Sequence, residues 1–461
     1  MPLTADPGSY RDPSGTVYDD GVNILRSVTK DGIGTFETVW STGYLQTLIQ
    51  KGWLVPVERL EASSQEETPA DACAILRHPR LSFISYPYEW PFELLRAAAL
   101  LHLDIQLDAF DQRIVLSDAS AYNIQFQGCR PIFIDHLSFR PYDVGQFWTG
   151  HQQFLQQFLN PLLLGSLLEV PYNAWYRGAP DGIPTAELER LLPLHKRLSI
   201  NVLNHVVLPA RFQAALSPMA SLSILREARL PPSSYIGILK RLRAWIARLR
   251  PLKSENTTWR NYDQFRNYGL PEQDEKRSFV QEFSATVKPK LFLDVGCNTG
   301  EFSEIALNAG ADEGVGLDFD HGALGLALQR SRDKGLRLLP LFLDVANLSP
   351  AQGWRGMERK SFTSRCNPDA LLALAILHHL AIARNTPLED AVRWLVSLAP
   401  CGIIEFVPKS DDAVRLLLQL REDIFSDYTE EHFLRIISSC TRINKIKRIT
   451  NSGRLLVWYQ P

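Results

Sequence analysis

One stretch decides the fold of the second half of this sequence: Leu291-Phe292-Leu293-Asp294-Val295-Gly296-Cys297-Asn298-Thr299-Gly300. It begins with an apolar run of the kind found in buried strands of parallel sheets. Gly296 and Gly300 permit a tight turn and a close approach of the backbone to a ligand. We expect a helix directly behind the turn, because the free N–H groups at its start would then face that ligand.

Strand and helix patterns alternate from this stretch to the C-terminus. Strands are predicted at 291–295, 314–317, 338–341, 370–377 and 403–406, and helices at 301–309, 323–334 and 388–398. Two further runs, 445–449 and 455–459, would form a closing antiparallel hairpin. The alternation predicts an α/β domain with a doubly wound, Rossmann-like sheet, which we place at residues 275–461.

Polar side chains follow the predicted strands. Asp318 ends the second strand, where its carboxylate can accept two hydrogen bonds from ribose hydroxyls. Asp344 ends the third strand and is a candidate neighbour of an adenine amino group. The fourth predicted strand ends in His378 and His379. The carboxyl ends of parallel strands form the ligand-binding edge of such a sheet, so we expect these groups to lie there.

The stretch from Asp294 to Gly300 resembles the first motif of the class I S-adenosylmethionine-dependent methyltransferases. The resemblance implies S-adenosylmethionine as cofactor, bound by residues of this motif that include Asp294 and Asn298. It implies that Gly296 and Gly300 lie against the methionine part, that Asp318 binds the ribose and that Asp344 lies near the adenine. Asn298 stands where the motif often has a third glycine, and asparagine tolerates unusual backbone angles. A nicotinamide-binding domain is the rival for this motif, but GxGxxG would require glycine at 298 and 301, where Asn and Glu stand.

The chemistry of methyl transfer requires alignment of the acceptor and, for a hydroxyl, removal of a proton. His378 or His379 is the candidate base; the alternative is that one histidine only caps a strand or helix. No Asn/Asp-Pro-Pro-Tyr signature follows the fourth strand, which disfavours amino methylation of bases or glutamine, and no paired catalytic cysteine is evident, which disfavours methylation of carbon 5 of pyrimidines. We expect O-methylation of a small molecule or saccharide. Glu405 and Lys409 would face the acceptor or form a surface ion pair.

A second pattern lies upstream, where Asp118 and Asn123 precede a predicted hairpin that ends in Asp135. This set suits phosphoryl transfer, in which one Asp accepts a hydroxyl proton while an Asn and a second Asp hold Mg²⁺. We expect the hairpin to bring the three side chains together. The plain alternative is a hairpin whose carboxylates only satisfy turns.

This segment resembles the protein-kinase-like superfamily, most closely its aminoglycoside and fructosamine kinase branch. The resemblance implies an α+β domain at 1–245, with a small lobe at about 1–88 and a helical lobe at about 89–245, joined by a hinge at 83–90 whose residues 83–86 read as a strand. It also implies Asp118 as catalytic base, Asn123 and Asp135 as metal ligands, and ATP with Mg²⁺ as cofactors.

Several residues depart from the kinase pattern. Leu116 replaces the usual His, His136-Leu137 follows Asp135, and only Arg26 is available to replace the usual strand lysine. Three possibilities therefore stay open for this domain: a kinase acting on the methyl acceptor, a domain that only binds the acceptor, and a pseudokinase scaffold that recruits a partner or carrier.

Composition narrows the function classes further. The 461 residues include 49 Lys+Arg and 51 Asp+Glu, a net charge of -2, which argues against DNA binding and disfavours an RNA methyltransferase. The six cysteines form no CxxC, and neither a signal peptide nor a membrane-length apolar run is evident, so we expect a soluble cytoplasmic protein. The sequence leaves a homo-oligomer open.

The two halves are joined by a polar linker at 246–274. Its aromatic residues Trp259, Tyr262 and Tyr268 would form a lid over the cofactor or attach the linker to the core. The whole arrangement resembles the nodulation-type methyltransferases, which are bacterial proteins with a long region before the cofactor domain. That resemblance implies a role in the biosynthesis of a modified glycan or secondary metabolite.

Overall fold

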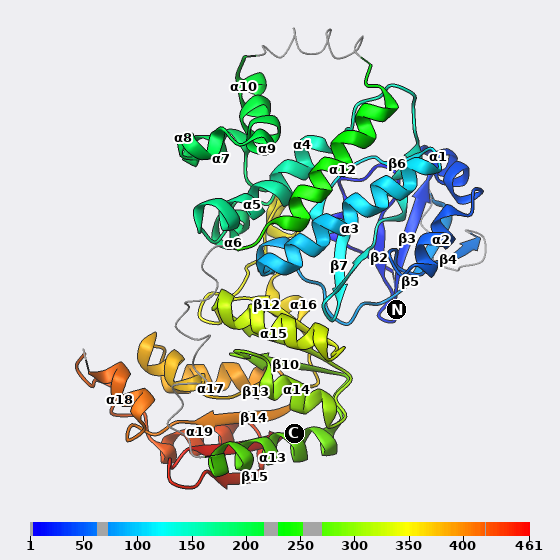
Figure 1. The fold of residues 1–461 in the computed structure, drawn as a ribbon. Helices are drawn as coiled ribbons and strands as arrows, with labels where there is room; N and C mark the ends of the chain where they lie inside the picture. Colours follow the sequence, from blue (N-terminus) through cyan, green and yellow to red (C-terminus); the bar gives the residue numbers. More distant parts are fainter. Residues whose placement is uncertain (1–2, 62–71, 216–228, 252–269, 420) are drawn as a thin grey trace. The chain divides into compact units, whose positions relative to one another are not determined.

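The computed structural model describes residues 3–61, 72–215, 229–251, 270–419 and 421–461 (Figure 1). The chain divides into two compact units: residues 1–253 with 351–359, and residues 254–350 with 360–461. The linker residues 252–269, including the three aromatic residues expected to cover the cofactor or attach the linker to the core, lie outside the described residues. None of the described helices combines the length and the apolar character that crossing a membrane would require.

The first unit begins with a five-stranded antiparallel sheet in the order β1-β2-β3-β5-β4. Its elements are β1 (Thr4–Ala5), β2 (Val17–Asp19), β3 (Asn23–Thr29), α1 (Lys30–Trp40), α2 (Tyr44–Gln50), β4 (Glu58–Glu61) and β5 (Ala72–Pro79). The sequence predicts a single helical pattern at 37–51, whereas the chain forms two helices. Gly43 explains the break, because its φ of +72° places it in the left-handed region between them.

The rest of the first unit is mainly helical around two short strand pairs. Strand β6 (Ile114–Leu116) pairs with β9 (Phe139–Pro141), and β7 (Ile124–Gln127) pairs with β8 (Arg130–Phe133), which confirms the predicted hairpin. The helices are α3 (Phe92–Asp111), α4 (His151–Phe154), α5 (Asn160–Leu163), α6 (Asn173–Gly178), α7 (Thr185–Leu191), α8 (Leu194–Arg197), α9 (Ile200–Val202), α10 (Leu208–Ala215) and α12 (Pro232–Arg248).

The strand predicted at 83–86 does not form. This segment is extended, but a side chain satisfies its backbone: Ser85 N donates to Gln125 Oε1 (2.9 Å), and Gln125 Nε2 donates to Ser85 O (3.0 Å). The real strand is β5, which begins inside the stretch that the sequence assigns to a polar loop. An apolar run alone does not distinguish a strand from a buried extended segment.

The second unit contains a seven-stranded sheet in the order β12-β11-β10-β13-β14-β16-β15 (Figure 1). The first five strands of this order are parallel, and β16 and β15 close the sheet in antiparallel pairing, as the sequence predicts. The strands are β10 (Leu291–Val295), β11 (Glu313–Asp318), β12 (Leu338–Phe342), β13 (Ala370–Ala373), β14 (Cys401–Phe406), β15 (Arg442–Arg448) and β16 (Leu455–Gln460). The helices are α13 (Leu270–Val287), α14 (Glu301–Asn308), α15 (His321–Asp333), α16 (Phe362–Arg365), α17 (Leu388–Ser397), α18 (Asp412–Leu418) and α19 (Glu430–Cys440).

The hydrophobic core of this unit fixes the position of β10 in the sheet. All five residues of β10 are buried, and Phe292 packs in one cluster with Phe279 and Phe283 of α13 and Leu372 of β13. Burial of apolar surface on this scale fixes β10 in the middle of the sheet. The strand order reverses between β10 and β13, and ligands bind at such a switch point in open α/β sheets.

The fourth parallel strand is shorter than predicted. The apolar run predicts a strand to residue 377, but β13 ends at Ala373 and Ala375 takes a left-handed φ of +53°. The chain then enters the π-helical turn η10 (His379–Ala383). His378 and His379 therefore begin a helical turn beyond the strand end, instead of standing at the end itself.

Candidate functional site

The glycine turn after β10 takes backbone angles that few side chains tolerate. Gly296, Asn298 and Gly300 have φ values of +79°, +49° and +74°. A Cβ on Gly296 would lie 3.3 Å from Ile376 Cδ1, so the turn has little room for a side chain. Asn298 adopts a left-handed backbone angle although it is not a glycine, because asparagine tolerates this conformation. Gly300 then serves as the N-cap of α14.

Asp318 holds this turn from the neighbouring strand. Its Oδ2 accepts a hydrogen bond from Asn298 N and its Oδ1 one from Asp320 N, both at 2.9 Å. Burial raises the pKa of Asp318 to about 6. Each carboxylate oxygen retains lone-pair capacity for a ligand hydroxyl.

Asp294 is buried at the end of β10 and accepts a hydrogen bond from Ser303 Oγ at 2.5 Å. Burial raises its pKa to about 7, although the bond to Ser303 and the nearby Lys276 both oppose that rise. A carboxyl group with this pKa is partly protonated at neutral pH, so it can act as donor and as acceptor.

A cavity lies at the carboxyl ends of the parallel strands. It is lined by Asp294, Gly296, Cys297, Asn298, Thr299 and Glu301 from the glycine motif, by Asp318 and Phe319, by Leu374, Ala375, Ile376 and His379, and by Glu272, Gln273, Lys276, Phe302, Glu405, Ile449 and Arg454. Most of the residues expected to bind the cofactor thus share one cavity with one candidate base.

The two histidines differ in their access to this cavity. His379 lines it, and burial lowers the pKa of its imidazole to about 4, so the ring is neutral at pH 7 and able to accept a proton. His378 is fully buried, is not among the lining residues, and has no hydrogen-bond partner on either ring nitrogen among the described residues. Their rings lie 4.2 Å apart. Of the two histidines, His379 is therefore the one that reaches the cavity.

Asp344 lies outside the set of lining residues. Its carboxylate accepts from Arg384 Nη2 at 2.8 Å and from Ala346 N at 3.0 Å. Lys409, expected at the acceptor side or in a surface pair, forms a pair with Asp423 at 2.7 Å in which both side chains are partly exposed. Glu405, for which the sequence predicts the same two alternatives as for Lys409, is buried and lines the cavity.

Sequence reasoning missed three residues of the cavity wall: Glu272 and Lys276 on α13, and Arg454 in the turn before β16. Glu272 and Lys276 are four residues apart and so share one face of α13. That spacing was available from the sequence, but nothing local indicated that this face would border a cavity.

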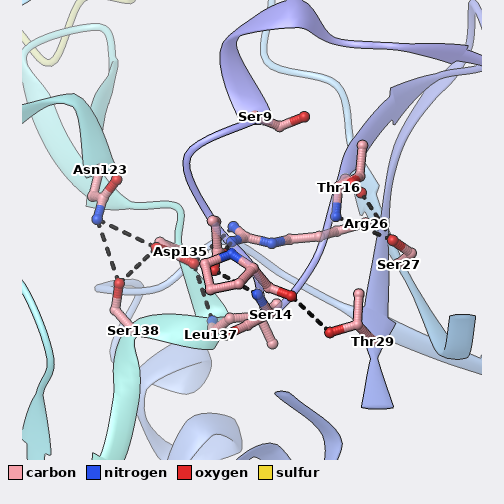
Figure 2. Close-up of polar contacts among 12 residues, drawn as sticks. Ser9, Ser14, Thr16, Arg26, Ser27, Thr29, Asn123, Asp135, Leu137 and Ser138 are labelled. Atoms are coloured by element: carbon pink, nitrogen blue, oxygen red, sulfur yellow. Dashed lines mark hydrogen bonds and ion pairs between the residues drawn. The ribbon is translucent and has the colours of Figure 1, made fainter. Parts of the chain in front are cut away.

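The second candidate site lies in the first unit, around Asp135. Figure 2 shows Asn123, Ser138 and Leu137 grouped about this residue, with Arg26 reaching toward it from β3. Asn123 Nδ2 lies 3.2 Å from Asp118 Oδ2 and 3.3 Å from Asp135 Oδ2. The hairpin therefore brings together the three side chains that the sequence singled out. Burial, followed by the charge of Asp135, raises the pKa of Asp118 to about 6.

The donor set around Asp135 does not fit Mg²⁺. Oδ1 accepts from Arg26 Nη1 (2.7 Å) and Leu137 N (3.0 Å), and Oδ2 accepts from Ser138 Oγ (2.6 Å) and Asn123 Nδ2 (3.3 Å). Arg26 is also paired with Asp12. Both oxygens are thus occupied by protein donors, and a cation would have to displace Arg26. The part of the chain that the structure describes holds no group of three or more His, Cys, Asp or Glu side chains arranged for a metal.

Residues 351–359 belong to the first unit although they lie between β12 and β13 in the chain. Buried Glu358 holds them there: its carboxylate accepts from Arg11 Nε (2.8 Å), Tyr10 Oη (3.2 Å) and Trp354 N (3.0 Å). The Arg359 guanidinium lies 4.1 Å from the ring centroid of Tyr122, one residue before Asn123. This segment therefore packs beside the Asp118–Asn123 turn.

Fold and site together define the second unit as a Rossmann-like α/β domain with its cavity at the switch point of the sheet. The chain is 43% identical over 455 residues to nodulation protein NoeA of Rhizobium meliloti (strain 1021), covering 98% of this chain and 95% of that protein. It belongs to the same family as this nodulation protein. No family model matches the chain.

Solved structures resemble parts of the chain more distantly. The N-methyltransferase NodS of Bradyrhizobium japonicum WM9 is 15% identical, with 41% of this chain and 96% of NodS covered at a TM-score of 0.31. The magnesium protoporphyrin IX methyltransferase ChlM of Synechocystis PCC 6803, solved with bound SAM, is 19% identical, with 45% of this chain and 93% of ChlM covered at a TM-score of 0.31. At these TM-scores neither likeness decides anything about the site.

Proposed function

We propose that the second unit transfers a methyl group from S-adenosylmethionine to a hydroxyl of a small molecule or saccharide. The observation that carries this proposal is the single cavity in which the glycine turn, Asp318 and His379 meet. The residues fit the cofactor. The left-handed glycine turn leaves room for a closely bound ligand, and Asp318 retains acceptor capacity for the two ribose hydroxyls.

The chain's own residues would then do three things. The turn at 296–300 would lie against the methionine part of S-adenosylmethionine and Asp318 would hold its ribose, while the bound cofactor would supply an electrophilic methyl group and the cavity would align the acceptor oxygen with it. As the new O–CH₃ bond forms and the S–CH₃ bond breaks, a neutral ring nitrogen of His379 takes the hydroxyl proton. Asp344, paired with Arg384 outside the lining residues, would take part only through the adenine end of the ligand.

The test is calorimetric binding of S-adenosylhomocysteine to the full chain. We expect a Kd in the range of about 1–100 µM. Gly296→Val should abolish binding, because its Cβ would lie against Ile376 at a φ of +79°. Gly325→Ala is the matched control, since a Cβ at that helical position meets nothing within 4 Å. Absence of binding by the wild-type chain would falsify the proposal.

For the first unit we infer a binding role rather than Mg²⁺-dependent phosphoryl transfer. The occupied carboxylate of Asp135 supports this choice among the open possibilities, because Arg26 takes the position that a cation would need. Asp118, Asn123 and Asp135 then shape a site that binds the acceptor, a partner or a carrier.

ATP with Mg²⁺ provides the test of that role. We expect no Mg²⁺-dependent shift of the melting temperature with ATP and no transfer of labelled phosphate. Production of ADP that disappears in Asp118→Asn would show instead that this unit is a kinase.

A further inference from the structure

A buried ion network forms part of the cavity wall beyond the glycine motif. Lys276 Nζ lies 2.5 Å from Glu405 Oε2, and Arg454 Nη1 lies 3.4 Å from Glu405 Oε1. Arg454 also pairs with Asp411 through its Nε at 2.7 Å. The side chains of Lys276, Glu405 and Arg454 are only 15%, 1% and 4% exposed.

Stability does not account well for this network. Removing charges from water costs several kcal/mol per ion, of order the gain from pairing them, so buried ion pairs add little net stability. Arg454 and Asp411 satisfy one another through two hydrogen bonds, at 2.7 and 3.0 Å. Lys276 and Glu405 line the cavity as Arg454 does, but they differ from the Arg454–Asp411 pair in retaining unused hydrogen-bonding capacity there.

The contacts of Lys276 and Glu405 show which of their hydrogen-bond donors and acceptors are unused. An ammonium carries three N–H donors, and among the described residues that of Lys276 hydrogen-bonds only to Glu405. It also lies 4.7 Å from the ring centroid of Phe302 and attracts the carboxyl group of Asp294. Glu405 Oε1 has only the long contact with Arg454 and so keeps an acceptor position. The pair therefore offers a donor and an acceptor side by side.

We propose that Lys276 and Glu405 are the specificity-determining pair of the methyl-transfer cavity, and that they select a neutral, polyhydroxylated acceptor such as a saccharide. This rests on the methyl-transfer function proposed above. A hydroxyl group both donates and accepts, so an acceptor with neighbouring hydroxyls satisfies Glu405 and Lys276 at once. An apolar ring with a single hydroxyl would leave Lys276 and Glu405 paired with each other but would cover their remaining donor and acceptor positions without hydrogen-bonding to both.

The charges around the cavity disfavour ionised acceptors. Besides Glu405, the wall contains the carboxylates of Glu272, Glu301 and Asp318, which repel an anion. A cationic amine would meet the ammonium of Lys276 beside the carboxylate that attracts it. A neutral hydroxylated molecule meets neither penalty, and His379 in the same cavity accepts the proton of the hydroxyl that becomes methylated.

The experiment measures transfer of a labelled methyl group by the full chain to a panel of probes: methyl α-glucoside, methyl β-galactoside and myo-inositol against the monohydric phenols phenol and 4-methylphenol. Glu405→Gln and Lys276→Gln are compared with Lys409→Gln, which removes a cation from the exposed pair with Asp423. Affinity for S-adenosylhomocysteine is measured for every variant by calorimetry.

We expect methylation of at least one hydroxylated probe and of neither phenolic probe. Loss of a hydrogen bond to a buried charge should lower kcat/KM about 30-fold or more in Glu405→Gln and in Lys276→Gln. The control should stay within about twofold, and the affinity for S-adenosylhomocysteine should be unchanged in all three variants.

Two results overturn the inference while leaving the methyltransferase proposal intact: S-adenosylhomocysteine binds, but no polyol is methylated or a phenol is preferred; or a polyol is methylated, but Glu405→Gln matches Lys409→Gln. Failure of the wild-type chain to bind S-adenosylhomocysteine removes the proposed function itself.

Discussion

Replacement of Asp318 by Asn tests how the second unit holds its nucleoside. The carboxylate lies at the end of β11, accepts the N–H groups of Asn298 and Asp320 at 2.9 Å, and lines the cavity. If it also accepts the two ribose hydroxyls, Asp318→Asn removes the charge from both bonds and turns one acceptor into a donor. Charge-assisted hydrogen bonds contribute about 1.5–3 kcal/mol, so we expect a loss of about 2 kcal/mol.

That loss corresponds to a Kd for S-adenosylhomocysteine about 30-fold weaker than wild type. The assay is titration calorimetry near pH 7.5, with Asp320→Asn as the matched control. Asp320 caps α15 by accepting from Gly322 N and Ala323 N and is not among the lining residues. Because asparagine is also a good N-cap, the control should bind within about twofold of wild type.

Acid titration adds a second readout. The pKa of Asp318 is raised to about 6 by burial, so its carboxylate is largely protonated at about pH 5. Wild-type affinity should therefore fall about tenfold between about pH 7 and about pH 5, whereas Asp318→Asn should lack this dependence. Wild-type affinity in Asp318→Asn at neutral pH would refute the assigned contact with the ribose.

Four further outcomes are expected. His379→Gln should lower kcat about 100-fold or more with S-adenosylhomocysteine affinity unchanged, whereas His378→Gln should act mainly on stability; equal kinetic losses in both variants would contradict His379 as the base. Arg26→Met should lower the free energy of unfolding by about 1.5–3 kcal/mol in urea titrations, because it removes the guanidinium partner of Asp135, a partly buried carboxylate; a loss below about 1 kcal/mol would contradict that pairing. Glu358→Gln should lower the free energy of unfolding by about 1–2 kcal/mol, whereas Glu389→Gln, which breaks an exposed pair with Arg393, should lower it by less than about 0.5 kcal/mol. Because Arg11 holds the pKa of Glu358 at about 2, the stability from this contact is present above about pH 4.5 and should disappear as pH falls toward about 2. This pH dependence should be absent from Glu358→Gln. Burial raises the pKa of Asp294 to about 7, so this group opposes folding once ionised, and its contribution to stability should decline as pH rises from about 4 to about 7; a chain whose Asp294→Asn variant keeps the same pH profile would contradict this sign.

The resemblance to kinases implies that Asp135 is a metal ligand, whereas in the structure its carboxylate binds the guanidinium of Arg26. The sequence places Asp118, Asn123 and Asp135 at intervals that suit a metal site, and the structure does bring them together. Those intervals did not indicate that Arg26 would be the fourth residue of this site. Arg26 is 109 positions away from Asp135 in the chain, and only the sheet that carries β3 places its guanidinium on the carboxylate.

The fate of residues 351–359 illustrates the same limit. Their sequence lies between two strands of the second unit, so local patterns assign them to that domain. Membership of the first unit depends on Arg11 and Tyr10, which lie 347 and 348 positions upstream of Glu358. No periodicity or turn signal encodes a contact at such a separation.

From the sequence by itself we could derive the strand–turn–helix at 291–308, the alternation that builds the second unit, the closing hairpin and the carboxylate after β11. These features depend on backbone preferences and on hydrophobic periods, which act over a few residues. The tertiary structure decided the end of β13 and thereby the separation of His379 from His378. It also decided the meeting of Lys276, Glu405 and Arg454, and the occupation of Asp135 by Arg26. Those outcomes depend on which distant side chains share a buried space. The partners are defined only once the sheets have assembled, because a buried charge without a partner would destabilise the fold.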